Sequence, residues 1–425
     1  MAARHRQPAR VLVVGSGQAG QQVTVCLRER GFTGRIALVG EEDTLPYERP
    51  PLSKAYLEGT VREPDLWLRP AAFYTRRSVE RITGEAVAVD RRARTVRLAD
   101  GSVHGYDHLV LATGARPRTL PVPGAGLPGV HVLRTLRDAA ALRGGLASAR
   151  RPVVVGAGLI GLEFGAAAQN AGRTVTVVEA LDRPLARVVS AHTAAHLTRL
   201  HRERGTTLLT GQRVTRFHAG HDGRVAAVEL AGGRLLPADL VLVSTGVGPR
   251  TELAESAGLP VADGIVTDAH LLTADPHISA VGDCAAFPGP GPGGLLRRES
   301  VQNATGHARL VADRLTGNHR TYAEVPWFWS RQHGATLQVA GDGRGHDTFH
   351  VLGEDPESFS VLLFRRGTLV AVESLGRPRD HMAARRLLGE GVPLTPRQAA
   401  QPGFCLKEHP ARAEAASRVP VPATV

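Results

Sequence analysis

The feature that most constrains this chain is a glycine-rich turn that occurs twice, each time between an apolar run and a helical stretch. The first copy is GSGQAG at 15–20, after the apolar run 11–14, and the second is GAGLIG at 156–161, after 153–155. In such a turn the first glycine permits the tight bend, the second lets a pyrophosphate approach the backbone, and the third lets the helix pack on the strand. The N-terminus of the helix then faces the phosphates.

Each turn is followed by the acidic residue that a dinucleotide site requires. RIALVG at 35–40 predicts the next parallel strand, and Glu41 follows it; TVTVV at 174–178 likewise ends at Glu179. A carboxylate at this position accepts hydrogen bonds from a ribose diol. A second internal sequence repeat consists of LVLATG at 109–114 and LVLVSTG at 240–246. One such unit would indicate a dehydrogenase, whereas two indicate a flavin and a nicotinamide cofactor that face each other.

Length and charge limit the class of protein. The 425 residues predict two or three domains, and no apolar run approaches the 18 to 20 residues of a membrane span. The basic start precedes only four apolar residues, so we expect no secretory signal and a cytoplasmic protein without a membrane partner. The net charge is +12, and all basic residues except Lys54 and Lys407 are arginines. Either the positive surface is diffuse, or it attracts an acidic protein or a nucleic acid.

The cysteines and histidines argue against metal and dithiol chemistry. Cys26, Cys284 and Cys405 form no C-x-x-C or C-x-x-x-x-C pair, and the histidines show no metal-ligand spacing. We therefore expect no metal site and no adjacent redox dithiol.

Four stretches of sequence carry a resemblance to a known family. YERPPLSKAYL at 47–57, LVLATGARP at 109–117, TADPHISAVGD at 273–283 and PWFWS at 326–330 resemble the flavin-dependent ferredoxin reductases of bacterial oxygenase systems, over about residues 10–410. The resemblance implies an α/β, glutathione-reductase-like flavoprotein with two dinucleotide-binding domains and a C-terminal α+β domain. It also implies electron transfer from NADH through FAD to a small acidic ferredoxin, [2Fe-2S] or similar, that serves a cytochrome P450 or a ring-hydroxylating oxygenase.

The resemblance predicts domain limits. The FAD-binding domain would comprise 1–118 and 247–321, the NAD-binding domain 119–246, and the C-terminal domain 322–410. We expect 1–9 to fray, 411–425 to be disordered, and the glycine- and proline-rich segment 288–294 to be a mobile loop.

The resemblance also assigns site residues. Lys54 would lie near flavin N5 and Glu163 near the nicotinamide, and these two residues are the catalytic candidates. We expect no catalytic acid or nucleophile from the protein, because hydride passes directly between the two cofactors. The residues expected to bind FAD are Gly15, Gly17, Ala19, Gly20, Glu41, Lys54, Ala112, Thr113, Gly114, Arg134, Gly282, Asp283, Val301 and Trp329. Those expected to bind NAD are Gly156, Gly158, Ile160, Gly161, Glu179 and Gly246.

Some positions depart from the family or leave questions open. Arg250 stands where the family has asparagine, and Arg183 lies close enough to Glu179 to bear on the choice between NADH and NADPH. Arg309 and Lys407 fall where the family is basic for docking its ferredoxin, although each can equally be an ordinary surface residue.

Two alternative functions fit the same architecture. An NADH oxidase-type flavoenzyme is disfavoured because no cysteine lies near residues 40–50. A flavoprotein of the apoptosis-inducing-factor type, which acts mainly by binding and contacts nucleic acid, is disfavoured because the chain has no lysine-rich patch. We therefore do not expect nucleic acid as a partner.

Overall fold

The computed structural model describes residues 7–289 and 294–409, which form two compact units. The first unit comprises the chain up to Arg118, Arg134–Leu136 and Gly246–Glu324, and the second comprises Thr119–Leu133, Arg137–Thr245 and the chain from Val325. The expectations for 1–6, 290–293 and 410–425 lie outside the described residues. Each unit is considered by itself.

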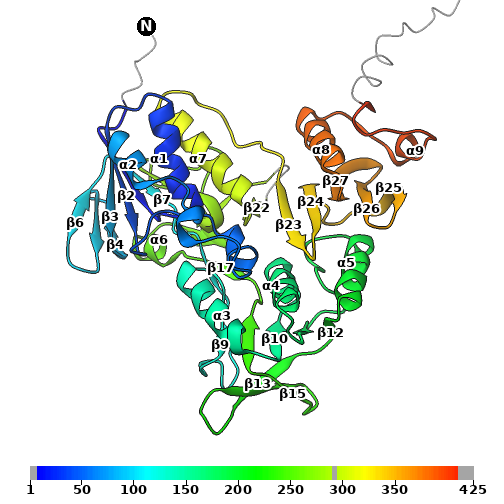
Figure 1. Ribbon diagram of the computed structural model, residues 1–425. Coiled ribbons are helices and arrows are strands. Elements are labelled where there is room, and N and C mark those ends of the chain that lie inside the picture. The colour runs from blue at the N-terminus through cyan, green and yellow to red at the C-terminus, as the bar shows by residue number, and fades with distance from the viewer. Residues whose placement is uncertain (1–6, 290–293, 410–425) are drawn as a thin grey trace, which may run out of the picture. The chain divides into compact units, whose positions relative to one another are not determined.

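A five-stranded parallel sheet organises the first unit (Figure 1). Its strands, in spatial order, are β20 (Ile278–Ala280), β7 (His108–Leu111), β1 (Arg10–Val14), β2 (Arg35–Gly40) and β3 (Val79–Thr83). β1 is buried from Val11 to Val14 because helices and strands cover both faces of the sheet. The first glycine-rich turn follows β1 and leads into α1 (Gln18–Glu29).

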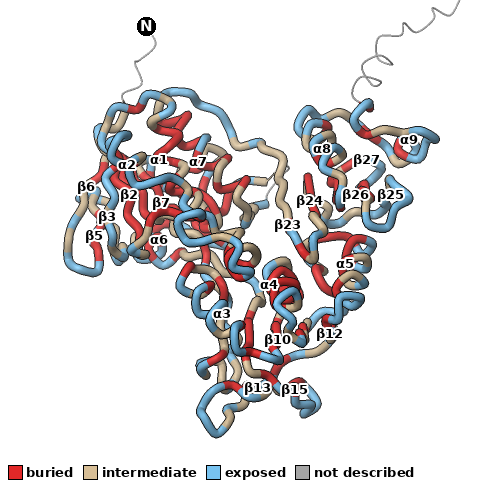
Figure 2. Tube along the Cα trace, in the orientation of Figure 1, coloured by how far each residue is buried: buried red, intermediate tan, exposed pale blue. Residues whose placement is uncertain are grey.

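Two layers cover this sheet. On one face α1 packs against α7 (Val301–Leu315), and Val23, Leu27 and Val311 lie in their shared core. On the other face Leu12 and Leu109 pack with residues of α6 (Glu252–Ser256) and of a small antiparallel sheet, β4 (Ala86–Asp90), β5 (Thr95–Leu98) and β6 (Val103–Gly105). Figure 2 shows β2, β7 and much of α1 and α7 as buried trace.

The second unit repeats this plan. Its parallel sheet has the order β9 (Val130–His131), β16 (Leu240–Val243), β10 (Pro152–Val155), β11 (Thr176–Val178) and β12 (Thr207–Leu209). An antiparallel sheet of β13 (Val214–Ala219), β14 (Val225–Leu230) and β15 (Leu235–Pro237) supplies Phe217 and Val228 to the same core as Val153 and Val155. The helices are α3 (Leu136–Ser148), α4 (Leu159–Asn170) and α5 (Ala191–Glu203). The internal sequence repeats therefore correspond to a structural repeat of the parallel sheet with its glycine-rich turn.

A third sheet, also in the second unit, is entirely antiparallel. Its order is β23 (Trp327–Gln332), β24 (Ala335–Gly341), β27 (Thr368–Leu375), β26 (Ser358–Arg365) and β25 (Thr348–Asp355), with α8 (Pro378–Glu390) and α9 (Pro396–Ala399) beside it. The sequence of β26 begins with alternating polar and apolar residues, a pattern that predicts one solvated face. That prediction is wrong, because the strand is buried continuously from Phe359 to Phe364. Phe364 packs in the core with α8, while Phe359 lies against His192 and His196 of α5, so neither face is solvated.

A buried carboxylate ties this third sheet to α5. Glu373 of β27, 2 % exposed, accepts hydrogen bonds from the backbone N–H of Ser190 at 2.7 Å and from its hydroxyl at 2.6 Å. The Thr193 hydroxyl also donates to it, at 2.5 Å. Ser190 caps α5, so an acidic group meets the positive end of that helix.

The remaining elements are short. They are the 3₁₀ turns η1 (Pro50–Ser53), η2 (Glu63–Leu66) and η3 (Gly282–Cys284), helix α2 (Ala71–Arg76), and strands β8 (Ala115–Pro117), β17 (Val247–Pro249), β18 (Val261–Ala262), β19 (Gly264–Val266), β21 (Ala285–Pro288) and β22 (Leu295–Leu296).

Two segments that we expected to be loose, 1–9 and 288–294, make ordered backbone contacts at their described ends. Ala9 does not fray, because its carbonyl accepts a hydrogen bond from the Arg35 N–H at 2.8 Å as β2 begins. Pro288 pairs with Leu295 in an antiparallel ladder, and the Gly289 N–H donates to the Gly294 carbonyl at 2.9 Å. Among the described residues, no helix has the length and apolar character needed to cross a membrane.

Candidate functional site

The predicted FAD residues of the first unit gather at one edge of its parallel sheet. Val14 aligns with Val39 and with Leu111, and Leu111 aligns with Ala280, so all four strands end at the same level. The segments that follow them therefore meet there. They are the glycine turn 15–20, Glu41, 112–114, and Gly282 with Asp283. Ligands of such sheets bind beyond the carboxyl ends of the strands.

The second unit places its own glycine turn in the same way. Val155 aligns with Val178 and with Val243, which brings the turn 156–161, Glu179 and the segment after β16 to one edge. The backbone contacts repeat as well: Gly15 N–H donates to Val39 at 2.9 Å, and Gly156 N–H donates to Val178 at 2.8 Å.

The glycines show that both turns fit a pyrophosphate. A Cβ at Gly15 or Gly20 would collide with backbone carbonyls, and Gly156 and Gly161 are confined in the same manner. By contrast, a Cβ at Gly17 or at Gly158 would meet nothing within 4 Å. The middle glycine of each turn thus borders open space, as the approach of a phosphate requires.

The helix N-termini agree with this fit. The caps of α1 and α4 are Gly17 and Gly158, and neither helix has a side-chain cap or an acidic residue in its first turn. In α5 and α7 the Ser190 and Ser300 side chains accept hydrogen bonds from the helix backbone. The first-turn N–H groups of α1 and α4 are therefore left for an anion.

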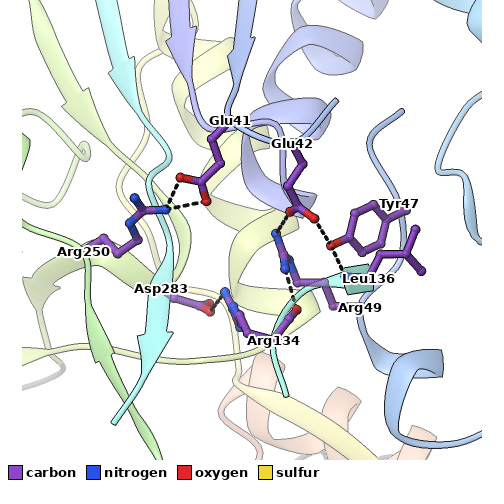
Figure 3. Close-up of polar contacts among 8 residues, drawn as sticks. All are labelled: Glu41, Glu42, Tyr47, Arg49, Arg134, Leu136, Arg250 and Asp283. Atoms are coloured by element: carbon purple, nitrogen blue, oxygen red, sulfur yellow. Dashed lines mark hydrogen bonds and ion pairs between the residues drawn. The ribbon is translucent and has the colours of Figure 1, made fainter. Parts of the chain in front are cut away.

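The two acidic residues predicted to bind ribose have different partners. One Arg250 nitrogen, Nη1, lies 2.7 and 2.8 Å from the two carboxylate oxygens of Glu41 (Figure 3). The backbone of Arg250 is held by the neighbouring loop, where its carbonyl accepts from the Thr113 hydroxyl at 2.6 Å and its N–H donates to Gly114 at 2.9 Å. Glu179 instead accepts from the Ala157 and Leu181 N–H groups at 2.7 and 2.9 Å.

An ion pair joins two further predicted FAD residues. Arg134 Nη2 donates to Asp283 Oδ2 at 3.0 Å (Figure 3). Gly114 permits this arrangement, because a Cβ there would lie 3.3 Å from Arg134 Nη2 and its φ of +71° disfavours a side chain. Arg49 Nη1 in turn donates to the Arg134 carbonyl at 2.5 Å.

A polar cluster around the buried Tyr47, which sequence reasoning missed, supports Arg134. The Tyr47 hydroxyl donates to Glu42 at 2.7 Å and accepts from the Leu136 N–H at 2.9 Å, while Arg49 pairs with Glu42 at 3.0 Å. Burial raises the pKa of Tyr47, so its hydroxyl remains a donor at neutral pH. Arg49, Glu42 and Tyr47 lie within a few residues of each other in the loop between β2 and η1, and this spacing is the signal that could have revealed them.

A second missed residue, His307, fixes the backbone beneath Asp283. The Gly282 N–H donates to His307 Nδ1 at 3.1 Å, and His307 is fully buried against Phe287 and Tyr322. Burial, reinforced by the charge of Arg298, lowers the pKa of His307 to about 3. The ring is therefore neutral, as its acceptor role requires.

The other candidates of the first unit are placed as follows. Lys54 follows η1 directly as its C-cap, and its ammonium donates to the Pro50 carbonyl at 3.0 Å. Val301 is the first residue of α7 and so lies at the N-terminus of that helix. Ala19 lies in α1, and a Cβ on Gly282 would be 2.9 Å from its methyl group. Gly246 has a φ of +96° and is the first residue of Gly246–Glu324, the last segment of the first unit.

The remaining candidates lie in the second unit. Glu163 is buried in α4, 5 % exposed, and accepts from the Ser330 hydroxyl at 2.6 Å. Ile160, 39 % exposed, is in the first turn of the same helix. Trp329 and Trp327 lie on β23 with ring centroids 5.7 Å apart. The approach of Trp329 to a flavin stays a prediction.

The cysteines show no redox pair among the described residues. Cys26 and Cys284 are buried, Cys405 is partly buried, and all three are free thiols. Burial raises the pKa of Cys284, which disfavours the thiolate needed for sulfur chemistry. The described residues also contain no group of three or more metal-ligating side chains.

Fold and site together define a flavoprotein reductase with two dinucleotide-binding halves. Residues 9–308 match the family described as pyridine nucleotide-disulphide oxidoreductase, and residues 327–409 match the family described as reductase C-terminal. The chain belongs to the pyridine nucleotide-disulphide oxidoreductase family and carries its reductase C-terminal domain. It is an oxidoreductase that uses FAD and a nicotinamide nucleotide.

Individual relatives narrow the comparison. The chain is 49 % identical over 399 residues to rhodocoxin reductase from Rhodococcus erythropolis, covering 93 % of both chains. A crystal structure of the ferredoxin reductase for the CYP199A2 system from Rhodopseudomonas palustris is 45 % identical, with a TM-score of 0.92 over 94 % of this chain and 99 % of that one. The covalent putidaredoxin reductase–putidaredoxin complex gives 38 % identity and a TM-score of 0.93, over 96 % and 100 %.

Proposed function

We propose that the protein passes electrons from NADH through FAD to a small acidic [2Fe-2S] ferredoxin, which serves a cytochrome P450 or a ring-hydroxylating oxygenase. The observation that carries the proposal is a repeated nucleotide-binding half in a chain without a cysteine pair. Relatives named for redoxins and for a P450 system support the same partner class. When bound, FAD supplies the chemistry: it takes up a hydride from NADH and releases the electrons singly.

The residues of the two sites have distinct tasks in this proposal. The turn 15–20 with the N-terminus of α1 binds the FAD pyrophosphate, and Asp283, oriented by Arg134, binds the ribityl chain. Glu41 accepts from the adenosine ribose, and Lys54 lies beside the flavin. Val301 offers the N-terminus of α7, whose dipole favours negative charge on the flavin ring.

The nicotinamide site is proposed to select NADH. Its pyrophosphate lies on the turn 156–161, and Glu179 accepts from the adenosine 2′-hydroxyl, where a 2′-phosphate would be repelled. Arg183 does not oppose this assignment, because its guanidinium donates to the carbonyls of Val189 and Ala186 at 3.2 Å each. Glu163 is assigned to the nicotinamide end.

The partner assignment is tested through charge. Arg309 on α7 and Lys407 near the end of the described chain are both exposed, and we propose that they dock the acidic ferredoxin. Arg309→Glu is expected to raise the KM for ferredoxin several-fold at low salt, because like charges then meet in the encounter complex. The same KM in the unchanged protein should rise steeply with salt.

The measurement is ferredoxin-coupled reduction of cytochrome c between low and high salt. Arg234→Glu is a matched control, since Arg234 is also exposed but lies in the turn between β14 and β15. A KM for ferredoxin that changes neither with salt nor with Arg309→Glu would contradict electrostatic docking.

A further inference from the structure

A line of buried polar side chains runs from β23 to Glu163. The Ser330 hydroxyl lies 2.6 Å from Glu163 Oε1, Gln332 Nε2 lies 3.0 Å from the Ser330 hydroxyl, and His201 Nε2 lies 2.9 Å from Gln332 Oε1. The exposed fractions of Glu163, Ser330, Gln332 and His201 are 5, 0, 2 and 0 %. We call these four residues the Glu163 chain. They come from α4, β23 and α5, all in the second unit.

The hydrogens of the Glu163 chain can point in only one direction. A carboxylate oxygen only accepts, so the single hydroxyl hydrogen of Ser330 is donated to Glu163. The Ser330 oxygen then accepts from the Gln332 amide nitrogen, and the Gln332 carbonyl oxygen accepts from His201. Every donor dipole is therefore oriented toward the Glu163 carboxylate, and hydrogen bonds aligned in this way strengthen one another.

His201 is suited to the far end of the line. Its Nε2 must carry the hydrogen, and its Nδ1 is buried without a hydrogen-bond partner. Burial lowers the pKa of His201, and also that of His333, whose ring centroid lies 4.6 Å away and whose pKa is lowered to about 4. A neutral His201 ring is thus the donor that holds the Gln332 amide in one orientation.

We propose that Ser330 and Gln332 are positioning residues for the nicotinamide site, which hold one Glu163 oxygen in place so that the carboxylate can accept from the carboxamide N–H of the nucleotide. The inference rests on the proposed role of Glu163. Both residues belong to the sheet of the C-terminal domain, so that domain completes the site formed by the glycine turn 156–161. Ser330 and Gln332 lie on the same side of β23 because successive side chains of a strand point to opposite faces. Residues 328, 330 and 332 therefore share one face of β23, and Trp327 and Trp329 lie on the other.

The test compares Ser330→Ala with Ser330→Thr in the FAD-loaded, full-length protein. Removing the hydroxyl should weaken NAD⁺ binding, measured by calorimetry, about tenfold, because the lost hydrogen bond is to a charged group. The KM for NADH should rise by a similar factor while kcat changes less. Threonine keeps the hydroxyl and should restore binding to within about twofold. Gln332→Leu should give a smaller loss of the same kind.

Two controls separate positioning from stability and from the role of Glu163. Ser360→Ala removes another fully buried serine hydroxyl from the same sheet, one that bonds Ser374 and Asp380 instead, and should leave NAD⁺ affinity unchanged. In a Glu163→Ala background, Ser330→Ala should cause no further loss.

Each result decides one level of the proposal. A full additional loss in the Glu163→Ala background, or normal affinity of Ser330→Ala, would overturn the positioning role while Glu163 keeps its own. Normal NAD⁺ affinity of Glu163→Ala alone would overturn the assignment of Glu163 and the positioning role with it.

Discussion

A Gly17→Val variant is expected to fold normally and to lose FAD, with its affinity lowered at least about a hundredfold. A Cβ at Gly17 meets no atom within 4 Å, and its φ of −73° suits any residue, so the apoprotein tolerates the valine. The isopropyl group would, however, occupy the space beside the N-terminus of α1 that the pyrophosphate needs. Flavin absorbance after gel filtration, and fluorescence titration of the apoprotein with FAD, measure the loss.

The matched variant Gly158→Val should do the reverse. Gly158 has the same open surroundings and extended backbone at the cap of α4, so this variant should retain FAD. Its flavin should no longer be bleached by NADH in an anaerobic cuvette, although dithionite reduces it. If Gly17→Val retained FAD and Gly158→Val lost it, the assignment of the two halves would be reversed.

The stability of the protein is expected to fall sharply below pH 6.5, because two buried histidines must stay neutral in the fold. Burial lowers the pKa of His307 to about 3, and burial together with the charge of Arg314 lowers that of His108 to about 3. The unfolded chain, with an ordinary histidine pKa near 6.5, therefore binds more protons between pH 6.5 and 3. Their stabilisation is fully present above pH 6.5 and is lost as the pH falls, by about 2 kcal/mol per histidine between pH 7 and pH 5.

His307→Asn isolates one of these contributions. The amide oxygen of asparagine can replace Nδ1 as acceptor for the Gly282 N–H but does not titrate. The change in free energy of unfolding between pH 7 and pH 5, from urea titrations at saturating FAD, should shrink by about 2 kcal/mol. His221→Asn, at an exposed turn, should leave the pH dependence unchanged. An equal pH dependence in the His307 variant and the unchanged protein would refute the account.

The parallel sheets were predictable because their signals are local. Each buried strand reads as an apolar run, and each turn needs glycines where backbone carbonyls lie too close for a Cβ, as at Gly15 and Gly156. Family, enzyme class and cofactors are confirmed by the comparisons, whereas the site residues and domain limits remain predictions.

The parts that sequence reasoning missed depend on contacts between distant segments. No residue near Glu163 in the sequence predicts its contact with Ser330. Ser330 lies on a strand of the C-terminal domain, where the sequence shows it only as a polar residue that follows aromatic ones. The continuous burial of β26 could not be predicted from its own sequence, because it depends on the packing of α5 against the second face of the strand. Arg250 was noticed as a departure from the family, but its pairing with Glu41 joins residues that lie far apart in the chain.

The most direct test of the central claim is an anaerobic titration of the FAD-loaded protein with NADH, followed by addition of an oxidised [2Fe-2S] ferredoxin. One equivalent of NADH should bleach the flavin band, and two equivalents of ferredoxin should restore it as each cluster takes up one electron. NADPH should act at least about tenfold more slowly. A flavin that NADH reduces but that cannot pass its electrons to any such ferredoxin would contradict the proposed function, and a purified protein unable to bind FAD would contradict the site itself.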